Sequence, residues 1–123
     1  MSVWIELIKG KYTLQLATTG RKTGLKRSTT TWFGILDGNL YVSSGRGERS
    51  DRVRNIARHA RVEVTIAGAT KQGNAKIIRD PQIKQRLRKL YWRKYHILML
   101  FSELGKMLAG IRPNESIPIL IEL

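Results

Sequence analysis

The chain has 123 residues, 41% of them hydrophobic, and a formal net charge of +14 from 23 Lys and Arg against 9 Asp and Glu. This length and composition predict one domain over residues 1–123, and the absence of cysteine excludes disulfides, thiolate metal sites and thiol catalysis. The charge favours an anionic partner, whether nucleic acid, an anionic membrane face or a polyanionic ligand. With no leader pattern and no apolar run of spanning length, we expect a cytoplasmic protein without a transmembrane segment.

The first half of the chain predicts strands joined by short turns. An apolar run at residues 12–17 predicts a strand, and residues 28–36, rich in Thr and aromatics, predict a second. Asp37-Gly38 is a strong two-residue hairpin signal, so residues 39–44 are expected to return as the partner strand.

A short helix and two more strands are expected next. Ser50 or Asp51 can cap a helix that runs to about His59. The segments that follow are predicted as a strand at 61–67, a turn at 68–73 and a strand at 74–79.

A long apolar-periodic segment closes the chain. Asp80-Pro81 is a helix start, and one helix to about residue 110, or two helices broken near Tyr95-His96, would satisfy the pattern. The apolar run at residues 97–101 is too short to span a membrane and is expected to pack in the core. Residues 117–123 predict a last strand, with Pro118 marking an edge or a strand start.

The order of these elements predicts the fold class. Strands, a short helix, strands, a longer helix and a final strand show no βαβ alternation, so a parallel nucleotide-binding sheet is not expected. We predict a mainly β protein with flanking helices (α+β), built as a barrel of about six antiparallel strands.

A basic, glycine-punctuated turn is the most informative local feature. Gly20 and Gly24 bracket Arg21, Lys22 and Thr23 between the first two predicted strands, with two further cations just beyond at 26 and 27. Loop amides, hydroxyls and cations in such a turn can hold an anionic group. The competing interpretation is a solvated basic hairpin.

The inventory of catalytic groups is thin. His59 and His96 lie in basic contexts without a carboxylate cluster, so metal ligation is not expected, and no nucleophile elbow or paired carboxylates occur. No catalytic residue can be named. Two roles remain: binding nucleic acid through the basic residues of the helix at 81–94, or holding an organic cofactor that carries the chemistry itself.

Three signals in order resemble the deazaflavin (F420)-dependent nitroreductase family. They are TTGRKTG at residues 18–24 followed by Arg27, the hairpin DGNLYVSSG at 37–45, and RNIA at 54–57 leading into VEV at 62–64. The resemblance spans about residues 14–79, and the closing Ile-Pro-Ile also matches. It implies a split β-barrel related to the FMN-binding pyridoxamine-phosphate-oxidase-like proteins.

The resemblance also implies a cofactor and its contacts. F420, with its phosphate and glutamate tail, would be held by Arg21, Lys22, Thr23 and Arg27. The residues expected around its ring are Ser43, Ser44, Gly45, Arg46 and Asn55. The implied activity is hydride transfer between F420 and a small organic acceptor, in a homodimer, with Tyr91, Tyr95 and His96 as candidates for the acceptor pocket.

Other ligands stay open at this stage. FMN, bound with or without turnover, and haem are alternative ligands, and a nucleic-acid-binding module is the alternative class. The chain departs from the family pattern in three places. Ser28-Thr29-Thr30 replaces a Pro after Arg27, Asp51-Arg52-Val53 replaces Pro-x-Trp before Asn55, and Arg46 displaces the second glycine of its turn.

Overall fold

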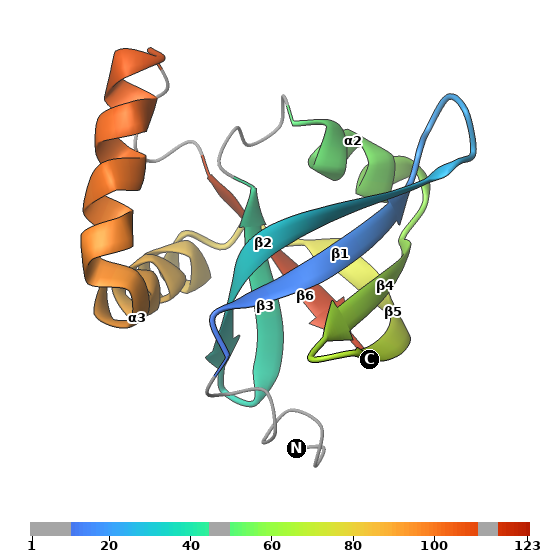
Figure 1. Cartoon of the computed structure of the whole chain (residues 1–123), viewed down its shortest axis with the longest axis horizontal. Coiled ribbons are helices and arrows are strands. Elements are labelled where there is room, and N and C mark those ends of the chain that lie inside the picture. Colours follow the sequence, from blue (N-terminus) through green and yellow to red (C-terminus); the bar gives the residue numbers. More distant parts are fainter. Residues whose placement is uncertain (1–10, 45–49, 111–115) are drawn as a thin grey trace.

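Six antiparallel strands close into a barrel in the computed structural model, which describes residues 11–44, 50–110 and 116–123 (Figure 1). Around the barrel the strands lie in the order β1-β2-β3-β6-β5-β4, and β4 pairs with β1 to close it. The strands are β1 (Thr13–Thr19), β2 (Lys26–Leu36), β3 (Asn39–Ser44), β4 (Arg61–Ile66), β5 (Ala69–Ile77) and β6 (Ile117–Glu122). The predicted fold class and strand number are confirmed.

Alternation along the strands fills the barrel. Leu14 and Leu16 of β1 point inward, as do Val62, Val64 and Ile66 of β4, because successive side chains of a strand face opposite sides. The interior is one apolar cluster with contributions from every strand. Because the strands pack on this core, it also positions the end of β1 and the start of β2, which flank the glycine turn.

The turn between β4 and β5 is shorter than the sequence predicts. Ala67 and Gly68 alone make it, with φ of 50° and 82°, and β5 already begins at Ala69, so the predicted turn at 68–73 is wrong. Gly73, taken as a turn residue, lies inside β5, where a Cβ would meet the Glu122 carbonyl oxygen at 2.4 Å. This glycine therefore allows β5 and β6 to approach each other closely and does not form a turn.

Helix α2 (Asp51–Arg58) crosses one end of the barrel (Figure 1). The Ser50 side chain caps it by accepting a hydrogen bond from the Val53 N–H at 3.0 Å. Val53 and Ile56 extend into the barrel core and plug that end. The helix N-terminus is thereby held beside the tips of β1 and β2.

Helix α3 (Pro81–Leu108) lies against the outer face of the barrel and is bent. Asp80 caps it, and Tyr95 has non-helical φ/ψ of −123° and 23°, so of the two expected arrangements the broken helix is correct. Before the bend, Leu87 and Tyr91 pack against β2, β3 and β6. After it, the helix stands away from the barrel (Figure 1).

One prediction on the last third is wrong, and one choice between two alternatives is decided. Within residues 97–101 only Met99 is known to be buried, whereas Leu98, Leu100 and Phe101 are exposed, because the bend carries their face away from the barrel. Pro118 lies between β3 and β5, so β6 is no edge strand and the proline marks its start. No helix in the described part of the chain is long and apolar enough to cross a membrane.

Candidate cofactor site

The glycine turn is held closed by its own hydrogen bonds. The Gly20 N–H donates to the Leu25 carbonyl at 2.8 Å, and the Gly24 N–H donates to the Gly20 carbonyl at 2.9 Å. Gly24 has a φ of +70°, which favours glycine. At Gly20 a Cβ would approach the Thr23 hydroxyl oxygen to 2.7 Å. The sequence thus shapes a tight turn at the tips of β1 and β2, with its amides and hydroxyls close together.

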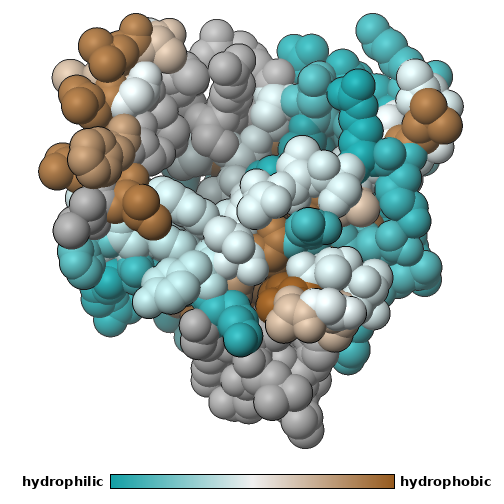
Figure 2. All heavy atoms as spheres, viewed as in Figure 1, coloured by the Kyte–Doolittle hydropathy of each residue, from teal (hydrophilic) through white to brown (hydrophobic). Residues whose placement is uncertain are grey.

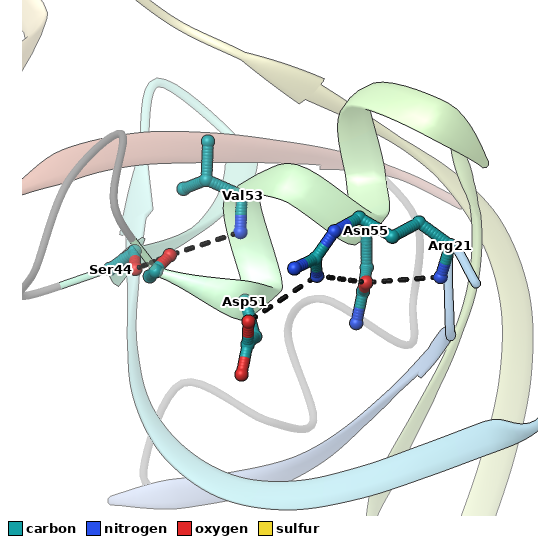
Figure 3. Close-up of polar contacts among 6 residues, drawn as sticks. Arg21, Ser44, Asp51, Val53 and Asn55 are labelled. Carbon is teal, nitrogen blue, oxygen red and sulfur yellow. Dashed lines mark hydrogen bonds and ion pairs between the residues drawn. The ribbon is translucent and has the colours of Figure 1, made fainter. Parts of the chain in front are cut away.

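Asn55 fastens this turn to helix α2 (Figure 3). Its side-chain oxygen accepts hydrogen bonds from the Arg21 backbone N–H at 3.1 Å and from the Arg21 guanidinium at 3.0 Å. The same guanidinium lies 3.3 Å from an Asp51 carboxylate oxygen. Asn55 is buried, so its amide is a fixed part of the site rather than a surface group.

Two hollows open at the junction of the turn and the helix. The first, called the turn hollow, has a volume of about 220 Å³ and is lined by Gly20, Arg21, Lys22, Thr23, Arg27, Asp51 and Asn55. The second, called the helix hollow, has a volume of about 350 Å³ and is lined by Thr18, Arg27, Thr29, Ser44, Ser50, Asp51, Arg52 and Asn55. The two share three lining residues and so form one extended depression.

The charges around the turn hollow favour an anion. Lys22 and Arg27 make no ion pair within the part of the chain that the structure describes. By contrast, the Lys26 ammonium pairs with Glu63 at 2.7 Å, and this hydrogen bond lowers the pKa of the Glu63 carboxyl. The N-terminus of α2 adds partial positive charge to the same side. Among the described residues that line either hollow, Asp51 is the one acidic side chain.

Arg52 is a site residue that the sequence did not single out. Its guanidinium donates to the Thr31 hydroxyl at 3.2 Å, the Ser43 carbonyl at 3.1 Å and the Thr29 hydroxyl at 3.0 Å. The β2–β3 pairing ends at Phe33 and Val42, so Arg52 bridges the two strands just where they separate. Burial lowers the pKa of this guanidinium.

A third hollow, called the elbow cavity, lies beyond that separation. It has a volume of about 280 Å³ and is lined by Thr30, Thr31, Trp32, Ser43, Lys84, Arg88, Tyr91, Met99, Glu103, Ser116 and Pro118. Arg88 and Glu103 form an ion pair of 3.0 Å across the bend of α3. Burial raises the pKa of the Tyr91 hydroxyl, which therefore stays protonated at neutral pH.

The structure brings most of the predicted residues to this depression. Arg21, Lys22, Thr23, Arg27 and Asn55 line the turn hollow, and Ser44 lines the helix hollow. Ser43 lies instead at the elbow cavity, because neighbouring residues of β3 face opposite sides of the barrel wall. Gly45 and Arg46 lie outside the described residues.

Of the three residues expected at the acceptor pocket, only one lines a described cavity. Tyr91 lines the elbow cavity, whereas His96 is exposed and Tyr95 is part of the packing between α3 and the barrel. Among the described residues no group of side chains could hold a metal ion, and His59 is exposed. Five residues that line the helix hollow were not predicted from the sequence: Thr18, Thr29, Ser50, Asp51 and Arg52. Their proximity depends on where β2 and β3 separate and on how α2 packs on the barrel.

Solved structures with similar folds confirm the fold predicted for this chain. A conserved hypothetical protein, Rv2991, from Mycobacterium tuberculosis matches with a TM-score of 0.76 at 19% identity, covering 98% of this chain and 79% of that one. A putative pyridoxamine 5'-phosphate oxidase from Listeria innocua matches at 0.69 and 14%, covering 96% and 88%. An F420-H2 dependent reductase, FDR-A, matches at 0.62 and 16%, covering 89% and 94%. The chain has the split-barrel fold.

The family follows from the sequence match. The F420H(2)-dependent quinone reductase family matches residues 4–97 of the 123, and the chain belongs to this family. Its cofactor is therefore F420 and its class of activity is F420-dependent oxidoreduction. No functionally curated protein matches the chain.

The depression fits the anionic end of F420. Lys22 and Arg27 are unpaired within the described residues, hydroxyls of Thr23 and Ser50 lie close by, and glycines keep the turn backbone accessible. Of the lining residues that the structure describes, only Asp51 opposes an anion, and its carboxylate lies 3.3 Å from the Arg21 guanidinium. A guanidinium fork and a point-charge ammonium suit phosphate and carboxylate oxygens respectively.

Proposed function

We propose that this protein binds F420 with its phosphate and glutamate tail in the turn hollow, and that reduced F420 delivers a hydride to a quinone. One observation carries the proposal: the turn hollow and the helix hollow share Arg27, Asp51 and Asn55 in their lining, and cations and hydroxyls line both hollows at the N-terminus of α2. Arg21, Lys22, Thr23 and Arg27 bind the tail in this proposal. Asn55 holds Arg21 and the turn in place.

The remaining residues position the ring end of the cofactor. Ser44 and Ser50 are linked by a hydrogen bond, and both line the helix hollow next to Arg52. Their hydroxyls and the Arg52 guanidinium offer donors along the path from the tail toward the separation of β2 and β3. The cofactor supplies the hydride when bound, so no protein nucleophile is needed.

The elbow cavity is the proposed acceptor site. It lies on the other side of the contact between Arg52 and Ser43, and Trp32, Tyr91 and Met99 give it apolar walls. A flat quinone ring suits such walls. The Tyr91 hydroxyl is the one aromatic hydroxyl among the described lining residues and donates to the Trp32 carbonyl at 3.5 Å; we propose that it turns to donate a hydrogen bond to the acceptor oxygen.

The proposal is tested by titration and turnover together. The protein is titrated with F420, with FMN and with a generic DNA duplex at two salt concentrations, and is then assayed with F420H2 and a set of quinone and nitro acceptors. We expect F420 to bind tightly and quinones to be reduced. Uptake of FMN in place of F420, or duplex binding with a steep salt dependence and no F420 uptake, would contradict it.

Three finer predictions accompany this function. A nitro compound as acceptor and a homodimer stay predictions of the family resemblance, and a cytoplasmic location stays a prediction from the sequence. One similar fold, with 17% identity and a TM-score of 0.62, is described as a domain-swapped dimer, so the oligomeric state of this chain is worth measuring. Light scattering on the purified protein answers it.

A further inference from the structure

The second half of α3 presents an apolar face to solvent. After the bend at Tyr95, six large apolar side chains are between 51% and 82% exposed: Leu98, Leu100, Phe101, Leu104, Met107 and Leu108. Figure 2 shows hydrophobic atoms gathered over this upright part of the helix. Contiguous exposed apolar patches of this kind mark interaction sites, whereas single exposed leucines do not.

These side chains form one stripe rather than a scatter. Leu100, Leu104 and Leu108 are spaced four residues apart and so lie above one another on the helix, with Phe101 and Met107 at their flanks. Met99 and Glu103 lie on the other side, where they line the elbow cavity. This part of α3 therefore has two different sides: one lines the elbow cavity, and the other presents apolar side chains to solvent.

The stripe is next to a strongly basic surface. Helix α3 carries seven Lys or Arg against one Glu, and six of the seven cations precede the bend. Lys89 and Arg93 are exposed in that first half, and Figure 2 shows hydrophilic atoms there, below the apolar stripe. An apolar face beside lysines and arginines is the composition of helices that lie in the interface of an anionic bilayer.

We propose that the second half of α3 docks on the surface of an anionic membrane, with the stripe from Leu100 to Leu108 inserted among the lipids and Lys89 and Arg93 at the headgroups. Charge complementarity selects this occupant over a second copy, because each copy carries a net charge of +14. The family match ends at residue 97, so the stripe is a feature of this chain rather than of the matched region.

Docking in this way has a consequence for the acceptor, which rests on the proposed function. Met99 and Glu103 line the elbow cavity on the other side of the same helical turns, so docking would hold that cavity one helix diameter, ~10 Å, from the lipid surface. A lipid-soluble quinone would then have only this short distance to travel between bilayer and cavity. The docking itself does not depend on which acceptor is reduced.

Vesicle flotation tests the docking directly. The intact protein is floated with vesicles of equal parts phosphatidylglycerol and phosphatidylcholine, and with vesicles of phosphatidylcholine alone. Leu104→Glu places a charge in the stripe, and Leu123→Glu makes the same change at a similarly exposed leucine at the chain end. We expect binding to the anionic vesicles only, an affinity about 10-fold lower for Leu104→Glu, and no change for Leu123→Glu.

A second variant and two further measurements complete the test. Lys89→Gln/Arg93→Gln leaves the stripe intact and should lose the preference for anionic vesicles. F420 binding by Leu104→Glu, followed by fluorescence, shows that the fold is retained independently of vesicle binding. Equal flotation of wild type and Leu104→Glu would overturn the proposal. So would a dimer that Leu104→Glu converts to monomers without an effect on vesicles, because a second copy would then cover the stripe.

Discussion

Asn55 and Arg21 lie 34 residues apart in the chain, and one side-chain oxygen of Asn55 accepts hydrogen bonds from both the backbone N–H and the guanidinium of Arg21. The contact joins the tip of the β1–β2 hairpin to the middle of α2. Because Asn55 lines both the turn hollow and the helix hollow, this contact holds the two hollows next to each other.

Removing the Asn55 acceptor should loosen the turn. In Asn55→Ala the Arg21 N–H loses its partner in a partly buried place, so we expect the free energy of unfolding to fall by about 1–3 kcal/mol and F420 affinity to fall with it. Urea unfolding and F420 titration measure the two effects. Arg54→Ala, at an exposed position of the same helix, is the matched control and should change stability by less than about 0.5 kcal/mol. Equal stability of the two variants would contradict the role assigned to Asn55.

Removing the Asp51 charge should strengthen cofactor binding. Asp51 faces the Arg21 guanidinium at 3.3 Å and is the only acidic side chain among the lining residues with a described structure. Asp51→Asn frees that guanidinium for the phosphate, and since exposed ion pairs are worth up to about 1 kcal/mol, F420 affinity should rise by about 2- to 5-fold. Glu122→Gln makes the same charge change at a remote ion pair with Lys76 and should leave the Kd unchanged. Weaker binding by Asp51→Asn would mean that the carboxylate supports the site.

The Tyr95 hydroxyl holds the bend of α3 against the barrel. It accepts from the Phe33 N–H at 3.3 Å and also contacts the Phe33 and Tyr12 carbonyls, at the point where β2 extends beyond the start of β1. Tyr95→Phe leaves these buried groups without that partner, so we expect a loss of about 1–3 kcal/mol in thermal or urea unfolding. Tyr12→Phe, at an exposed ring, is the control. A loss no larger than the control's would show that stacking on Trp32, not the hydroxyl, holds the bend.

The Lys94 ammonium should make stability depend on pH. Its Nζ lies over the Phe33 ring at 3.7 Å and 3.2 Å from the Phe33 carbonyl oxygen, and burial lowers the pKa of Lys94 to about 8 from a model-peptide value of 10.5. Between these two values the unfolded chain binds more protons than the folded chain, so stability rises with pH across that window. The effect is modest because the group is only half-buried. Urea unfolding from pH 7.5 to 9.5 measures it below the range where tyrosines titrate.

Replacement of the same side chain supplies the control for that pH dependence. Lys94→Met keeps the apolar stem and removes the titrating group, so the rise in stability between pH 7.5 and 9.5 should disappear. The Phe33 carbonyl retains the Tyr95 hydroxyl as a partner. An unchanged slope in the variant would assign the pH dependence to another group.

The sequence predicts most of the barrel because local signals there agree with the fold. Asp37-Gly38 closes the β2–β3 hairpin as expected, and Asp80-Pro81 begins α3. Gly73 misled the prediction, since a glycine inside a strand looks like a turn until β6 is seen to approach it. The run at residues 97–101 was likewise expected in the core, because periodicity does not reveal which side of a bent helix meets the barrel.

The candidate site divides in a similar way. The cations and glycines of the turn could be singled out from residues 18–27, because a contiguous segment carries them. Arg52 could not, since its role arises from three oxygens on two strands that separate beside it. Ser43 was placed with Ser44 in sequence, but the strand sends the two side chains to different hollows.

The binding of F420 by Lys22→Ala/Arg27→Ala tests the central claim most directly. These two cations line the turn hollow and make no ion pair among the described residues, so their removal should change the ligand contact more than the fold. Lys26→Ala, which removes a neighbouring cation already paired with Glu63, is the control. Titration followed by cofactor fluorescence should give a Kd at least about 10-fold higher for the double variant and a nearly unchanged Kd for the control. The same Kd in all three proteins would place the F420 tail elsewhere.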